Sequence, residues 1–67
     1  MVFGDNFKKL RQESKLSQKQ VAERLGIYQS NVSDWENDIS RPEYEKLIQL
    51  TKLYGCSIAE LLGIEED

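Results

Sequence analysis

The chain has 67 residues, of which 39% are apolar and 31% are charged, so we expect one soluble domain with a thin core rather than a disordered chain or two domains. Nine lysines and arginines against twelve aspartates and glutamates give a net charge of −3. This balance argues against nonspecific, charge-driven binding to nucleic acid, because neutralising phosphates needs clustered basic residues.

The first predicted helix carries an apolar face near the start of the chain. Phe3, Phe7 and Leu10 recur at intervals of three and four residues, and Ser14 continues the series. The other faces carry basic side chains, at Lys8, Lys9, Arg11 and Lys15.

The second helix is predicted to begin at Gln18 and to end at Gly26. Ser17 and Gln20 form a capping box, in which each side chain bonds the other residue's backbone N–H. Gly26 suits the left-handed turn that ends a helix. The inward stripe consists of Val21, Ala22 and Leu25.

A third helix follows after Ile27, with Tyr28, Val32 and Trp35 predicted on its apolar face. Its outer face carries small or amide side chains almost throughout. Residues 37–42 form a predicted loop, and Pro42 is suited to the first turn of the next helix.

The fourth helix is rich in apolar residues on one side and stops at Gly55. That side consists of Tyr44, Leu47, Ile48, Leu50, Thr51 and Tyr54. Ser57 and Glu60 form a second capping box for a short fifth helix, which Gly63 ends. No segment alternates as a strand does, so the prediction is an all-α, five-helix orthogonal bundle.

Two short helices joined by a tight turn containing glycine describe a helix-turn-helix unit. The sequence also resembles the XRE family of lambda-repressor-like DNA-binding domains from Phe7 to Leu62. The matching landmarks are Leu10-Arg11, Leu16-Ser17-Gln18, Val21-Ala22, Leu25-Gly26, Val32-Ser33, Trp35-Glu36, Pro42, Leu47, Leu50, Gly55 and Leu61-Leu62. The resemblance implies a single compact helix-turn-helix domain over residues 1–67, with its core at 7–62 and an acidic tail at 65–67.

The resemblance also implies that residues from about Gln29 to Glu36 form the recognition helix, whose N-terminal part enters the major groove. The candidate base-contacting residues are Gln29, Ser30, Asn31, Ser33 and Asp34. Gln29 can donate and accept together at adenine, and Asp34 can accept from the amino group of cytosine. Polar residues on a helix are also often simply solvated, and for Asn31 and Asp34 that alternative stays open.

Gln18 matches the family position that touches a phosphate, at a helix start whose free N–H groups favour an anion. The other candidate phosphate ligands are Asn37, Arg41, Lys9 and Lys15. Arg11 and Glu36 match a pair that in the family forms a partly buried ion pair, so we interpret them as structural rather than DNA-contacting.

The sequence departs from the family pattern in three places. Tyr28 stands where a serine or threonine cap is usual, so the recognition helix lacks a side-chain cap. Asp34 brings negative charge to the face that approaches phosphates, and Asp38-Ile39 replaces a glycine and a basic residue that are frequent in that loop. These last two departures lower the expected generic affinity for DNA.

We predict a cytoplasmic, sequence-specific regulator of transcription that binds double-stranded DNA, as a repressor on a palindromic operator. Two domains bind more tightly than one, so a homodimer is expected, with its interface around Ile58, Leu61, Leu62 and Ile64. The alternative for Ile58 and Leu61 is a place in the core.

The competing function is a protein-interaction module with the same fold and no DNA binding. An enzyme is not expected, because the chain has no histidine, and its one cysteine, Cys56, is better explained as a core residue than as a redox or metal site. No cofactor, metal, membrane partner or small-molecule ligand is expected.

Overall fold

The structure is a computed structural model that describes residues 3–64, and this range forms five α-helices without a strand. The predicted all-α class is therefore confirmed. The helices are α1 (Phe3–Glu13), α2 (Gln18–Leu25), α3 (Gln29–Glu36), α4 (Tyr44–Tyr54) and α5 (Ile58–Leu62). None of the five has the length and apolar character that a membrane span requires.

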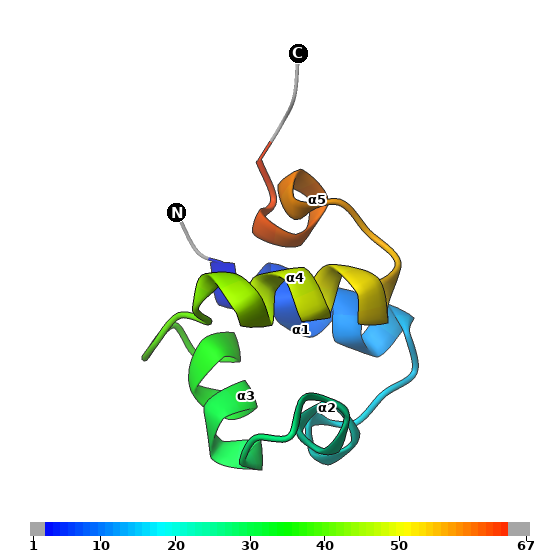
Figure 1. Ribbon diagram of the computed structural model, residues 1–67. Helices are drawn as coiled ribbons and strands as arrows, with labels where there is room; N and C mark the ends of the chain where they lie inside the picture. Colours follow the sequence, from blue (N-terminus) through cyan, green and yellow to red (C-terminus); the bar gives the residue numbers. More distant parts are fainter. Residues whose placement is uncertain (1–2, 65–67) are drawn as a thin grey trace.

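In Figure 1, α1 and α4 lie across the middle of the molecule, and the other three helices pack around them. In this view α5 lies above and contacts both α1 and α4, while α2 and α3 lie below and contact each other. α3 also packs against α1. The start of α3 is therefore at the lower edge of the molecule, far from α5.

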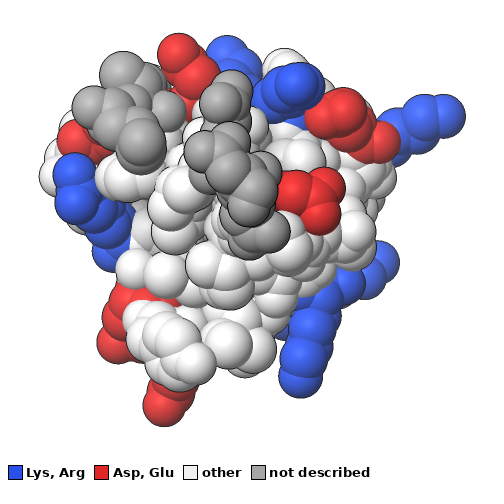
Figure 2. All heavy atoms as spheres, turned by 90° about the horizontal axis from the view of Figure 1, so that it is seen from above, with Lys and Arg blue, Asp and Glu red and all other residues white. Residues whose placement is uncertain are grey.

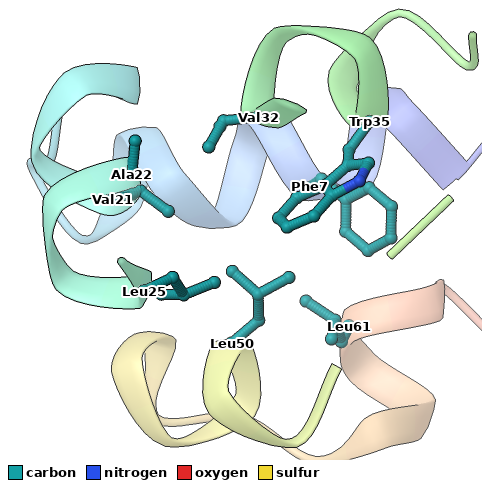
Figure 3. Packing of buried hydrophobic residues seen from close by; sticks show 8 residues of the cluster. All are labelled: Phe7, Val21, Ala22, Leu25, Val32, Trp35, Leu50 and Leu61. Atoms are coloured by element: carbon teal, nitrogen blue, oxygen red, sulfur yellow. The ribbon is translucent and has the colours of Figure 1, made fainter. Parts of the chain in front are cut away.

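All five helices contribute to one small core (Figure 3). Trp35 from α3 lies against Phe7 of α1, Val32 points toward the α2 side, and Leu50 and Leu61 close the core from α4 and α5. The α2 stripe of Val21, Ala22 and Leu25 is buried, as predicted. Because each helix is short, this shared burial rather than helix propensity stabilises the segments.

Both predicted capping boxes are present. The Gln20 N–H donates to Ser17 Oγ at 3.0 Å while the Ser17 N–H donates to Gln20 Oε1 at 2.8 Å, and Ser57 and Glu60 form the same pair. Gly26 ends α2 with a φ of 68°, a left-handed conformation that suits glycine. The ends of the helix-turn-helix unit are therefore set by local chemistry.

Four positional predictions were wrong. Ser14 lies in the turn after α1, and Pro42 precedes α4, whose N-cap position is Glu43. Tyr28 and Tyr44 were expected on apolar faces, but they are 80% and 74% exposed. Tyr28 precedes α3 and Tyr44 is the first residue of α4, so neither side chain follows the rotation that turns later residues inward.

The start of α1 joins two parts of the fold that the sequence did not connect. The Gly4 N–H donates to Asp38 Oδ1 at 2.9 Å, and a Cβ at Gly4 would collide with the Glu36 carbonyl. Asn6 Nδ2 donates to the carbonyl oxygens of Glu60 and Leu61 at the end of α5. α1 thus fixes both the end of α3 and the position of α5.

Candidate nucleic-acid interface

The exposed face of α3 is held outward by its buried face. Val32, Trp35 and Glu36 are buried, so each of the two turns of this eight-residue helix contributes at least one buried residue. Gln29 and Ser30, in the first turn on the other side, are exposed. The two side chains therefore project from a helix whose rotation is fixed by the core.

The turn between α2 and α3 is closed by backbone bonds. The Ile27 N–H donates to the Ala22 carbonyl at 3.0 Å, and the Asn31 N–H donates to the Tyr28 carbonyl at 3.0 Å. Tyr28 has an extended backbone at the N-cap position and gives no side-chain cap bond, as the sequence predicted. The Gln29 and Ser30 N–H groups, ahead of the bonded Asn31 N–H, have no side-chain cap from Tyr28 and can donate to an external acceptor.

Arg11 and Glu36 form the predicted ion pair beneath the α3 end. Arg11 Nε donates to Glu36 Oε2 at 2.6 Å and Nη2 donates to Oε1 at 3.0 Å, with side-chain exposures of 11% and 3%. Arg11 Nη1 also donates to the Leu16 carbonyl at 2.9 Å. The pair therefore ties α1, the α1–α2 turn and α3 together.

The contact between Arg11 and Glu36 affects the pKa of Arg11 itself and that of the neighbouring Tyr54. The hydrogen bond to Glu36 raises the pKa of Arg11, against a smaller lowering by burial. The pKa of Tyr54 is also raised, first by burial and then by the Glu36 carboxylate. Arg11 thus stays charged and Tyr54 stays neutral throughout the physiological range.

Gln18, the predicted phosphate ligand, is partly engaged inside the protein. Its Nε2 donates to Glu36 Oε1 at 3.1 Å, so the start of α2 lies beside the end of α3. One amide proton of Gln18 and the free N–H groups of the first α2 turn remain for another acceptor. The bond holds the half-buried Gln18 side chain in place.

The remaining predicted base-contacting residues are less exposed than Gln29 and Ser30. Asn31, Ser33 and Asp34 are half-buried. Asn31 lines a hollow with Trp35, at the side of α3 that faces α4. Asn37, a predicted phosphate ligand, is exposed, and its Nδ2 donates to the Ser33 carbonyl at 2.9 Å.

The three basic candidates are all exposed: Arg41, Lys9 and Lys15. The Arg41 guanidinium lies 4.9 Å from the centre of the Phe3 ring, a cation–π contact that anchors the loop before α4. Lys15 lies in the α1–α2 turn with a φ of 59°. From the sequence, Asp38 was interpreted as a charge that weakens DNA binding. In the structure its carboxylate accepts a hydrogen bond from the Gly4 N–H and so stabilises the start of α1.

The predicted dimer residues fall into two groups. Leu61 is completely buried and belongs to the core, so its assignment to an interface was wrong. Ile58 and Ile64 are 37% and 46% exposed, and Leu62 is half-buried in an apolar hollow beside Phe3. Figure 2 shows the α5 side of the molecule, where basic and acidic side chains alternate around the rim and an acidic side chain also lies nearer the middle.

A family model described as helix-turn-helix matches residues 7–61 of this chain. The chain belongs to the helix-turn-helix family, in its XRE group. The matched range covers every buried core residue and both helices of the turn, α2 and α3.

Similar proteins carry the names of transcriptional regulators. Over 98% of this chain and 52% of its own length, the regulator ImmR of Bacillus subtilis is 38% identical. The phage CTXphi repressor RstR of Vibrio cholerae is 32% identical over 97% of this chain and 59% of its own length. The chain spans about half the length of these curated relatives.

Two solved structures share the helix-turn-helix arrangement. The P22 c2 repressor, solved in complex with a synthetic operator, superposes with a TM-score of 0.87 at 26% identity, covering 97% of this chain and 98% of that chain. A transcriptional regulator from Listeria innocua superposes with a TM-score of 0.86 at 32% identity over 97% of this chain and 61% of that one. The five-helix fold is therefore that of repressor-type helix-turn-helix proteins.

Proposed function

We propose that this chain is the DNA-binding domain of a sequence-specific transcriptional repressor, with α3 inserted in the major groove. The observation that carries the proposal is the exposed polar first turn of α3, held outward by the buried Val32, Trp35 and Glu36. In helix-turn-helix proteins the N-terminal residues of the second helix contact base edges. Gln29 and Ser30 stand at those positions.

In this proposal, the start of α3 contacts the bases, and residues near its other end contact phosphates and so fix the position of the protein along the DNA. α3 has eight residues and is therefore about 12 Å long. Gln29 begins it, whereas Gln18 and Asn37 lie near Glu36, where it ends. This separation matches a division between base readout and phosphate positioning.

Gln18 combines two donors for one phosphate. Its side-chain amide retains a free proton, and the first turn of α2 supplies backbone N–H groups and the positive end of the helix dipole. Because Glu36 already holds the side chain, little conformational entropy is lost when a phosphate binds. Arg41, Lys9 and Lys15 extend the candidate basic contacts.

We also propose that two copies bind a palindromic operator through a symmetric dimer. Ile58 and Ile64 are exposed apolar side chains on and after α5, at 37% and 46%. Such a patch suits a self-complementary contact. Repression would follow from occupying a promoter, in line with the repressor names of RstR and the P22 c2 protein.

A selection of duplexes from a random pool by the purified chain tests the function. The expected result is an enriched sequence whose affinity falls as salt rises, since phosphate contacts release counterions. Binding to no duplex at low salt would instead favour the protein-interaction module.

Two glutamine variants test the assigned roles on the selected duplex. Gln29→Ala should weaken binding to the selected site more than to an unrelated duplex, while Gln18→Ala should weaken both and reduce the salt slope. Gln49→Ala, on the exposed side of α4, is the matched control and should change neither. Equal losses from Gln29→Ala on every sequence would remove its assignment as a base reader.

The dimer is tested with the operator rather than the free protein. Ile58→Glu should lower affinity for the two-half-site duplex and leave affinity for a single half-site unchanged. Loss on both duplexes alike would contradict the interface at α5.

A further inference from the structure

Tyr28 is the most exposed large apolar side chain among residues 3–64, at 80%. It occupies the N-cap position of α3 with an extended backbone, and its side chain does not bond the helix. Its chain neighbours Gln29 and Ser30 are exposed as well. A rigid aromatic ring is therefore displayed beside the two proposed base-reading side chains, where a smaller polar residue would cap the helix better.

The major groove offers one main apolar group to such a ring. Base edges there present hydrogen-bond donors and acceptors, together with the C5 methyl group of thymine. Gln29 and Ser30 have the polar atoms that match the donors and acceptors. The Tyr28 ring lacks polar atoms on its faces, and contact with a methyl group would remove apolar surface of both from water.

We propose that Tyr28 is a specificity-determining residue whose ring packs on the C5 methyl of one thymine in each half-site. The inference rests on the proposed function, because it requires the start of α3 to lie in the groove. The side chain suits this role because its two rotatable bonds lose little entropy on binding. The hydroxyl group plays no part in the discrimination and remains in water.

The test removes the methyl group and the ring separately. In the selected duplex, each thymine is replaced in turn by deoxyuridine, which lacks only the methyl, and dissociation constants are measured for the wild type, Tyr28→Phe and Tyr28→Ser. At one position in each half-site, replacing thymine by deoxyuridine should weaken wild-type binding about fourfold, the value of one buried methyl-sized group. Tyr28→Phe should show the same ratio, and Tyr28→Ser should bind the two duplexes equally.

Tyr44→Ser is the matched control, because Tyr44 is similarly exposed at 74% but begins α4 instead of α3. It should retain the full deoxyuridine penalty. Trp35 is buried in the core and is the only tryptophan, so its fluorescence reports whether each variant is folded.

Three outcomes would overturn the proposal. They are a wild type indifferent to deoxyuridine at every position, a Tyr28→Ser variant that keeps the penalty, and a Tyr28→Phe variant that loses it, the last indicating a hydroxyl contact. Failure of the proposed function is a different result, since the wild type would then select no sequence. A chain that selects an operator but shows any of the three overturns the role of Tyr28 alone.

Discussion

Replacing Arg11 with alanine should remove a large part of the stability of the domain. The Glu36 side chain is 3% exposed in the intact pair, and the substitution leaves its carboxylate with Gln18 Nε2 as its remaining side-chain donor. Breaking a buried pair by removing one partner costs about 3–5 kcal/mol. A chain of 67 residues has a total stability of about 3–10 kcal/mol at typical values per residue, so the loss is at least about a third of it and can be all of it.

Comparing single and double variants separates the contribution of the ion pair to the free energy of unfolding from that of the surrounding contacts. Arg11→Met combined with Glu36→Met removes both charges and keeps side-chain volume, so it should cost less than either Arg11→Ala or Arg11→Met alone. The Leu16 carbonyl loses its donor in all three, at about 1 kcal/mol. Arg11→Lys should fall between wild type and alanine, because an ammonium cannot make the two-pronged contact.

Urea unfolding followed by the fluorescence of Trp35 measures these differences. Trp35 is 7% exposed and adjoins Glu36 in the chain, so it reports the loss of the α3 core. The reasoning would be refuted if Arg11→Ala cost less than about 1 kcal/mol, the value for an exposed ion pair. It would also be refuted if the two methionine substitutions were additive, because partners in a buried pair must couple.

Three further predictions concern other parts of the fold. Gly4→Ala should destabilise by about 1–3 kcal/mol in urea unfolding, because its Cβ would collide with the Glu36 carbonyl, whereas the exposed Lys8→Ala on the same helix should be near neutral. Burial and Glu36 raise the folded-state pKa of Tyr54 above its ordinary value of 10.0, so the stabilisation from the neutral phenol is complete below about pH 10 and is lost as pH rises further. Melting temperatures from pH 8 to 11 should show that loss reduced in Tyr54→Phe, with a ceiling of about 1.4 kcal/mol per pH unit before solvent screening, and an unchanged pH dependence would contradict it. Cys56 should react with a thiol reagent at pH 8 more slowly than in urea, since burial, and secondarily Glu60, raises the pKa of its thiol, and equal rates would count against this.

Features that depend on neighbours in sequence were predictable. Ser17 and Gln20, like Ser57 and Glu60, satisfy each other's backbone across three residues, and the start of α2 and of α5 followed directly. The Arg11–Glu36 pair was also anticipated, but from the family resemblance. Spacing alone gives no reason to join two residues 25 positions apart.

Features that depend on tertiary contacts were not predictable. The Asp38 bond to Gly4 spans 34 residues, and the Asn6 bond to Leu61 spans 55. From sequence alone Asp38 is a loop charge, and nothing indicates that α1 begins beside it. The Gln18 bond to Glu36 was missed for the same reason.

Helical periodicity also misplaced two tyrosines at helix boundaries. Tyr28 fits the spacing of Val32 and Trp35, but the rotation of 100° per residue applies only inside a helix, and Tyr28 has an extended backbone. The same spacing placed Tyr44 inward at the first residue of α4, where few neighbouring side chains can cover it. Because of this error, the sequence did not predict the exposed Tyr28 ring that we propose contacts thymine.

The bonds from Asn6 to the last turn of α5 bring the beginning and the end of the described chain to one part of the molecule, at the opposite end from the first residue of α3. A fluorophore, affinity tag or tether joined near either end of the described range would thus be attached at a distance from the proposed DNA-contacting residues of α3. Two copies could be fused in tandem through that side, with a linker length chosen to set the spacing of their half-sites.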